Sequence, residues 1–142
     1  MSGREDYRKQ RIRTPAHVYT DLAGTCLDFA CLFGAFLENM KAHPVIAVVH
    51  VAGGAHAVAG CWLRDAPRAA IVQDPQLVRD ALARGDLFFV ETTGIAYAER
   101  PVAREKRSRG LLTYAKSKDA AHTLLTQPDA KLGFVLNVLS AR

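Results

Sequence analysis

Residues 25–40 constrain the fold more than any other stretch, because they predict a helix that fits only the middle of a domain. Thr25 and Asp28 match a capping box, in which each side chain bonds the other residue's backbone N–H, so the helix starts at Cys26. The residues that follow are apolar on nearly all sides until polar residues return near the end. A helix of this kind is normally buried at the centre of a domain, and we expect Pro44 to end it.

Short strands and further helices follow this helix. Residues 45–51 are rich in β-branched side chains and predict a strand. Gly53-Gly54 makes a turn and a second strand over 55–63 follows, so an antiparallel hairpin is expected. The remaining expected elements are a helix over 75–84 that stops at Gly85, a strand over 87–93, one or two helices over 102–126 and a strand over 132–139. This order predicts an α+β domain whose buried helix packs on an antiparallel or mixed sheet.

The length of 142 residues suits one domain, which we place at residues 14–142 behind a basic N-terminal arm at 1–13. No apolar stretch reaches the roughly 18 residues that span a bilayer, and the N-terminus lacks the apolar core of a signal peptide. The three cysteines show no paired spacing, which favours a reducing compartment. We therefore expect a cytoplasmic protein without a membrane partner.

Cys26 would occupy the first position of the capped helix. The first amides of a helix have no partners inside it and carry about half a positive charge, so a thiolate placed there is stabilised. Because the thiolate is the reactive form of cysteine, this position suits a nucleophile. The alternative is that Cys26 is a small buried hydrophobe, as free cysteines often are, and we interpret Cys31 and Cys61 in that way.

His56 lies in the expected strand over 55–63, where side chains alternate between the two faces of a sheet. It shares one face with Val58, Gly60 and Trp62, and small neighbours leave room for a substrate above the imidazole. A base histidine needs an acceptor on its second ring nitrogen, which fixes its tautomer and orientation. A lone histidine near an apolar strand is more often a satisfied structural residue, so this alternative stays open.

Glu91 is the expected acceptor for such a histidine. It interrupts a strand that is otherwise apolar, and a carboxylate inside such a strand must have a partner. Asp86 is the second choice but lies in a loop, as do Asp65 and Asp74. Asp28 is better explained as a helix cap.

The order of these residues, a cysteine on a helix and then a histidine and an acid on strands, resembles the transglutaminase-like superfamily, whose fold is related to that of papain. The resemblance rests on Gly24-Thr25-Cys26-Leu27-Asp28, on the strand from Gly54 through His56 to Trp62, on Val90-Glu91-Thr92-Thr93, and, for a bacterial branch, on residues 10–15 and 134–142. It implies a buried central helix on an antiparallel sheet. It also implies Cys26 as nucleophile, His56 as general base and Glu91 as acid, with no cofactor.

The activity that this resemblance implies is acyl transfer at an amide of a protein or peptide substrate, through a thioester. Water as acceptor gives a peptidase or deamidase and an amine gives a transglutaminase. We expect hydrolysis, because water needs no second substrate pocket. The Cys26 amide is a natural oxyanion donor, and Tyr19 or Gln10 is a candidate for the second.

Two features depart from the family's pattern. Many members use Asp where this chain has Glu91. The gap from His56 to Glu91 is also longer than usual, because it contains residues 64–85, which we interpret as an inserted loop and helix. Either departure fits a remodelled substrate cleft or an inactive descendant, and domains of this type often form part of larger proteins.

The net charge of +5 is partly local, since five basic residues crowd the segment 100–109. An inactive binding module could use this segment to hold an acidic protein or a nucleic acid, although a solvated basic surface is the simpler interpretation. A zinc site on Cys26, His56 and Glu91 is chemically permitted. No Cys-x-x-Cys or His-x-x-x-His pair supports it, so no metal is expected.

Overall fold

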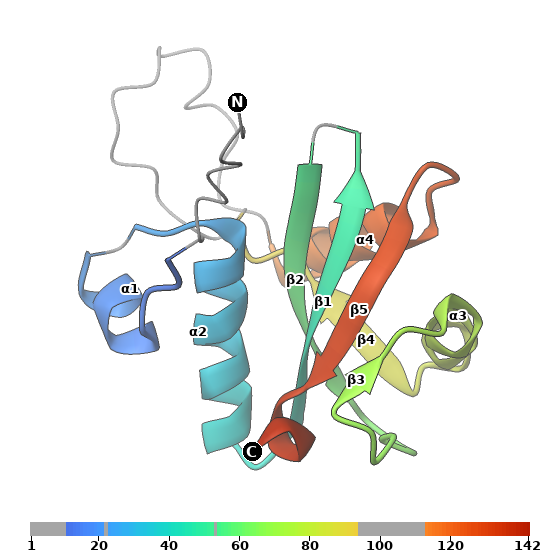
Figure 1. Cartoon of the computed structure of the whole chain (residues 1–142), viewed down its shortest axis with the longest axis horizontal. Helices are drawn as coiled ribbons and strands as arrows, with labels where there is room; N and C mark the ends of the chain where they lie inside the picture. Colours follow the sequence, from blue (N-terminus) through green and yellow to red (C-terminus); the bar gives the residue numbers. More distant parts are fainter. Residues whose placement is uncertain (1–10, 22, 53, 94–112) are drawn as a thin grey trace, which may run out of the picture.

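The computed structural model describes residues 11–21, 23–52, 54–93 and 113–142. Its elements are α1 (Pro15–Asp21), α2 (Cys26–Asn39), β1 (His43–Val51), β2 (Gly54–Trp62), β3 (Ile71–Val72), α3 (Pro75–Arg84), β4 (Leu87–Val90), α4 (Tyr114–Thr126), β5 (Lys131–Asn137) and the 3-10 helix η3 (Val138–Ala141). The strands form one antiparallel sheet in the order β3-β5-β1-β2-β4 (Figure 1). The described residues thus form the α+β fold that the sequence predicts.

The helices cover both faces of this sheet. On one face α2 packs against Ile46 of β1 and against Ala57 and Ala59 of β2, whose small side chains let the helix approach closely. The opposite face carries the larger core, in which side chains such as Val58 pack with residues of α3 and α4. The short helix α1 lies against α2 on the side away from the sheet (Figure 1).

The central helix α2 begins as expected, because both halves of the capping box between Thr25 and Asp28 are formed. It ends at Asn39, and the chain then turns through Lys41, whose φ of 62° is left-handed. The expectation that Pro44 ends the helix is wrong. Pro44 lies buried inside β1. The pairing of β1 with β5 begins one residue later, at Val45, so β5 does not require the N–H group that proline lacks.

The strand β3 lies inside the stretch 64–85, which the sequence suggests to be only a loop and a helix. Asn137, at the end of β5, holds the loop that leads into this short strand. Its backbone N–H donates to the Ala70 carbonyl at 2.8 Å, and its side-chain amide donates to the Ala69 carbonyl at 2.5 Å. Its side-chain oxygen accepts the indole N–H of Trp62 at 2.8 Å. The expected insertion is therefore part of the sheet.

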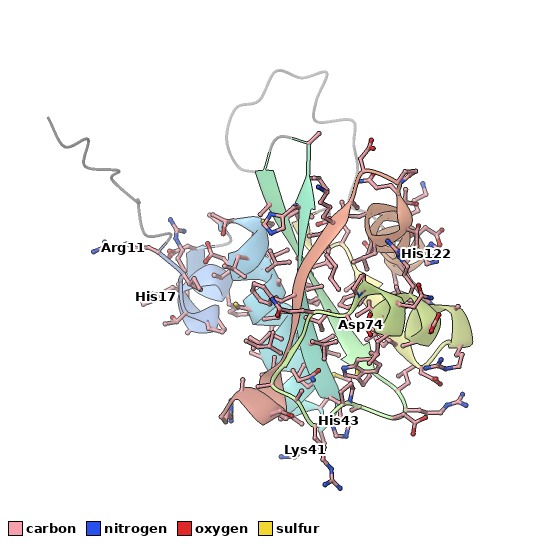
Figure 2. The ribbon with its side chains drawn as sticks, turned by 45° about the vertical axis from the view of Figure 1, so that its right-hand side comes forward. Arg11, His17, Lys41, His43, Asp74 and His122 are labelled. Atoms are coloured by element: carbon pink, nitrogen blue, oxygen red, sulfur yellow. The ribbon has the colours of Figure 1, made fainter. Side chains whose placement is uncertain are left out.

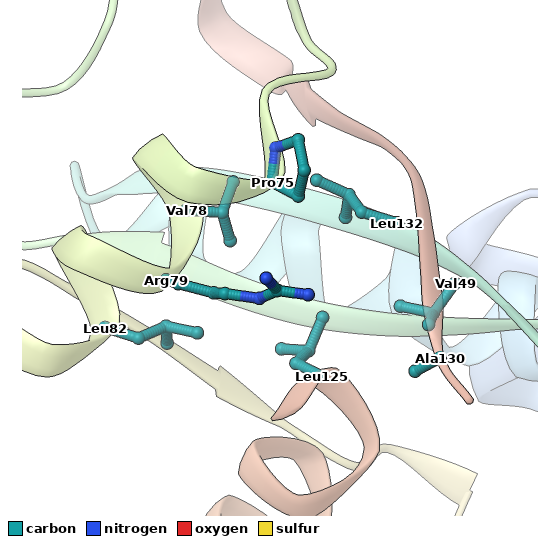
Figure 3. A pocket seen from close by; sticks show the side chains of 8 residues that line it. All are labelled: Val49, Pro75, Val78, Arg79, Leu82, Leu125, Ala130 and Leu132. Atoms are coloured by element: carbon teal, nitrogen blue, oxygen red, sulfur yellow. The ribbon is translucent and has the colours of Figure 1, made fainter. Parts of the chain in front are cut away.

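The helix α3, which follows β3, also packs against the sheet. Asp74 caps its start by accepting the backbone N–H groups of Gln76 and Leu77, and the left-handed Gly85 ends it, as the sequence predicts. The cavity left between α3, α4 and the sheet measures only about 10 Å³ (Figure 3). Such a volume is at the lower limit for a water molecule, so α3 is well packed.

Two boundaries near the candidate site differ from those expected. The strand β4 ends at Val90, so Glu91 follows the strand instead of lying within it. Of the helices expected over 102–126, the structure describes α4. The basic segment 100–109 lies outside the described residues, as does most of the arm at 1–13.

Within the described ranges, no single helix is long and apolar enough to cross a membrane. Taken together, α1 and α2 reach the length and apolar composition of a membrane span, but they are bent by 110° relative to each other.

Candidate active site

Cys26 is the first residue of α2, and the backbone that leads into it is fixed by Asp28. The carboxylate of Asp28 accepts the backbone N–H groups of Thr25 and Arg13, each at 2.8 Å. Gly24 packs so closely that a Cβ there would lie 2.8 Å from the Cβ of Asp28. The half-buried Cys26 thiol therefore follows a segment with little freedom to move.

The same contacts keep Asp28 ionised. Burial alone would raise the pKa of Asp28, but the hydrogen bonds from Thr25 and Arg13 outweigh it and hold that pKa below its ordinary value. Burial raises the pKa of the Cys31 thiol, and the charge of Asp28 adds to this effect. Cys31 is thus kept protonated, as a packing role requires, and Cys61 is buried as expected.

His56 and Glu91 form a hydrogen-bonded pair. The imidazole Nε2 lies 2.5 Å from the carboxylate Oε2, and the two side chains are 25% and 14% exposed. The hydrogen bond to Glu91 raises the pKa of His56 above its ordinary value, although burial opposes the effect. The acid expected from the sequence is thus the one that contacts His56.

Glu91 is held from several directions. Its second carboxylate oxygen, Oε1, accepts the backbone N–H of Thr93 at 2.9 Å and the Thr93 hydroxyl at 2.6 Å. Its backbone N–H donates to the Ser117 carbonyl of α4 at 2.9 Å. Burial would raise the pKa of Glu91, but the hydrogen bonds from His56 and Thr93 together hold it below its ordinary value. The carboxylate is therefore fixed and charged.

Thr93 is a residue of this site that the sequence argument did not assign. Its only sequence signal is a hydroxyl two residues after a carboxylate, where a side chain can bond back to a nearby backbone or side-chain group. Thr92, the residue between them, is fully buried, and its hydroxyl has no hydrogen-bond partner among the described residues. Thr93 thus holds the Glu91 carboxylate by two hydrogen bonds, whereas the Thr92 hydroxyl makes none to it among the described residues.

Cys26 belongs to the other face of β2. It packs with the cluster that contains Ala57 and Ala59, whereas alternation along the strand directs His56 to the face of Val58. In the described part of the chain no hydrogen bond joins the Cys26 thiol to the imidazole. The structure therefore brings His56 and Glu91 together and places Cys26 against the opposite face of β2.

The ring nitrogen that remains for proton transfer is Nδ1, because Glu91 occupies Nε2 of His56. Nδ1 is bonded to the ring carbon that carries the Cβ, so it lies nearer to the backbone of β2 than Nε2 does. The neighbouring residue along that backbone is Ala57, in whose cluster Cys26 packs. Ala57 points to the opposite face of β2 from His56, however, so the thiol and the imidazole lie on different sides of this strand.

The alternative acids have structural roles. Asp86 is buried, accepts Arg84 Nε at 2.8 Å, and through its carbonyl accepts the backbone N–H of Leu63 at 2.7 Å. It therefore joins the chain after β2 to the start of β4. Asp74 caps α3, and Asp65 lies in a loop with a left-handed φ of 50°. None of these three is hydrogen-bonded to His56 within the described residues.

Tyr19, a candidate for the second oxyanion donor, is not placed near Cys26. Its ring is 66% exposed and packs edge-on against Phe36, with ring centroids 6.4 Å apart. Phe36 lies ten residues after Cys26 along α2, which corresponds to about 15 Å along the helix axis. The other candidate, Gln10, lies outside the described residues.

No group of three or more His, Cys, Asp or Glu side chains in the described ranges could hold a metal ion.

The sequence matches no family model, and no curated protein or solved structure matches the chain either.

Proposed function

We propose that this chain is a transglutaminase-like cysteine hydrolase with a papain-like fold, which cleaves an amide of a protein or peptide substrate in the cytoplasm. The observation that carries the proposal is the hydrogen bond between His56 and Glu91. It supports the proposal because an imidazole oriented by a carboxylate suits both the uptake of a thiol proton and its transfer to a leaving amine. Cys26 at the start of α2 adds helix amides that stabilise a thiolate.

In the proposed reaction, Nδ1 of His56 takes the proton from the Cys26 thiol. The thiolate attacks the amide carbonyl carbon, and the Cys26 backbone N–H donates to the oxyanion that develops. The tetrahedral intermediate collapses to a thioester as the imidazolium of His56 protonates the leaving amine. Water then attacks the thioester and gives its proton to His56, which returns it to the departing thiolate.

Glu91 stays ionised throughout this sequence, and its charge stabilises the imidazolium of His56. Thr93 keeps the longer Glu side chain in one orientation by two hydrogen bonds. The extra carbon of Glu91 relative to the Asp of many transglutaminase-like proteins is therefore compatible with a fixed acid.

The proposal requires the Cys26 sulfur to come within hydrogen-bond distance of Nδ1 on His56. Catalytic hydrogen bonds are often long in enzymes without substrate and shorten when the substrate binds. Because Cys26 packs on the Ala57 face of β2 and His56 lies on the Val58 face, this approach requires the start of β2 or of α2 to change position.

An inactive binding module of the same fold is the second candidate, because Cys26 and His56 are not hydrogen-bonded within the described residues. Such a module would hold an acidic protein or a nucleic acid through the basic segment 100–109. Its binding would weaken steeply with salt, and its cysteines would show no special reactivity.

The test is the rate of alkylation of each cysteine by iodoacetamide as a function of pH, measured by peptide mass spectrometry. We expect Cys26 to react fast below pH 7 and to lose this advantage in both His56→Ala and Glu91→Gln, because the imidazolium then no longer stabilises the thiolate. Cys31 and Cys61 serve as internal controls. If Cys26 instead reacts only near pH 8.5, about the value for a free thiol, the second candidate replaces the first.

A further inference from the structure

A hollow of about 270 Å³ opens beside β4, between the end of α3 and the side of α4. Leucine and phenylalanine side chains, among them Leu63, Leu82 and Phe88, line its apolar part, and Lys118 and His122 of α4 lie along another side. This volume is just below that of typical small-ligand pockets, about 300–1,000 Å³. It suits one or two amino-acid side chains better than a large cofactor.

Lys118 gives the lining of this hollow a positive charge, and His122 adds the polar nitrogens of an imidazole. Neither Lys118 nor His122 makes a side-chain hydrogen bond or an ion pair within the described residues, and no described carboxylate lines the hollow. Both residues are exposed, and His122 is seen on the outer side of α4 (Figure 2). A carboxylate held here would therefore gain attraction without displacing an internal partner.

The strand that forms the floor is at the edge of the sheet. Among the described strands β4 pairs only with β2, so its other side lacks a strand partner. An edge of this kind can accept an extended peptide through backbone hydrogen bonds. Alternate side chains of such a peptide lie about 6.6 Å apart, and two helix residues four positions apart, like Lys118 and His122, are separated by about 6 Å.

We propose that this hollow binds an extended peptide segment in which acidic residues alternate with apolar ones. One carboxylate pairs with the Lys118 ammonium and the other accepts a hydrogen bond from the imidazole of His122, while an apolar side chain fills the space lined by Leu63, Leu82 and Phe88. Because β4 leads directly to Glu91, a peptide bound here would extend toward the His56–Glu91 pair. As a statement about substrates the inference rests on the proposed function, but binding itself needs no catalysis.

The test is fluorescence anisotropy on the full chain carrying Cys26→Ala, which removes turnover. The probe is fluorescein-labelled Leu-Glu-Leu-Glu-Leu, and its matched control is Leu-Gln-Leu-Gln-Leu. We expect saturable binding of the acidic peptide, with affinity about tenfold weaker for the neutral one.

Lys118→Glu should also weaken binding of the acidic peptide about tenfold, because it replaces an attraction by a repulsion. Lys116→Glu, on the same helix but outside the lining of the hollow, should change the affinity by less than about twofold.

The apolar part is tested by Leu63→Ser, with Leu139→Ser as the matched control on another exposed leucine. We expect the first to weaken binding several-fold and the second to leave it unchanged, with both variants folded by circular dichroism. Equal binding of the two peptides, no saturable binding, or equal effects of Lys118→Glu and Lys116→Glu would each overturn the inference. Peptide binding with unreactive Cys26 would keep the docking site and reject the hydrolase, and the reverse result would do the opposite.

Discussion

The two parts of the candidate site are held in place by different kinds of contact. Cys26 is positioned by its own neighbours in the sequence, through the capping box of Thr25 and Asp28. His56 and Glu91 are 35 residues apart and meet only because β2 pairs with β4. The first arrangement is local and rigid, whereas the second depends on the register of the sheet.

This difference shows where the proposed chemistry is most sensitive. Each part is held by its own hydrogen bonds, but Cys26 lies on one face of β2 and the side chain of His56 lies on the other. The relative position of the thiol and the imidazole therefore depends on how α2 packs against Ala57 and Ala59, not on either part alone. Substitutions that disturb one part and spare the other can separate these contributions.

The largest effect should come from the cysteine part, with Asp28→Ala. Asp28 accepts two backbone N–H groups with a charged carboxylate, and each such bond contributes about 1.5–3 kcal/mol. We expect a loss of about 3 kcal/mol in the free energy of unfolding, measured by urea denaturation. Asp119→Ala is the control, since this exposed aspartate of α4 should change stability by less than about 0.5 kcal/mol. A loss below about 1 kcal/mol for Asp28→Ala would mean that the segment before Cys26 is not held as described.

A smaller effect that depends on pH is expected from the other part, with Glu91→Gln. His56 has a raised pKa in the fold, so its stabilisation is full below its ordinary value of 6.5 and is lost as pH rises through the raised value. Glu91 has a lowered pKa, so its stabilisation is full above its ordinary value of 4.5 and is lost as pH falls through the lowered value. The pair therefore contributes most between these two ordinary values.

Unfolding of the native chain and of Glu91→Gln, followed over this pH range, checks the expectation. The difference in stability should reach about 2 kcal/mol near the middle of the range and shrink above the folded pKa of His56. In the same samples, the His56 pKa followed by NMR should fall toward its ordinary value in the variant. A difference in stability that does not vary with pH would contradict an ionised pair.

Features that depend on adjacent residues, the cysteine part among them, could be predicted from the sequence. The capping box and the stop at Gly85 are signals carried by one or a few adjacent residues, and the structure has both where expected. The hairpin of β1 and β2 was equally visible, because β-branched residues and paired glycines mark it. Because side chains alternate between the two faces of a strand, the face that His56 shares with Val58 could be predicted directly.

What could not be predicted depends on contacts between distant segments. No periodicity marks a two-residue strand such as β3, which is held in place largely by Asn137. The sequence also contains no signal for which face of the sheet α2 covers, because both faces of the hairpin are apolar. For this reason the order of Cys26, His56 and Glu91 along the chain was clear, whereas the separation of Cys26 from His56 was not.

The smallest expected effects come from the two threonines after β4, and they show how sharply the acid is positioned. Thr93→Val removes the hydroxyl that donates to Glu91 but keeps the backbone N–H, so we expect a loss of about 1 kcal/mol and a rise in the Glu91 pKa. Thr92→Val has nearly the same shape but removes a buried hydroxyl that has no partner within the part of the chain that the structure describes. It should leave stability unchanged or raise it by up to about 1 kcal/mol, because an unsatisfied polar group is costly to bury. Thermal unfolding and carboxyl NMR titration of both variants measure the contrast. If the two substitutions destabilise the protein equally, the hydroxyl of Thr93 has no special role in holding Glu91, and the acid part of the site depends on the sheet register alone.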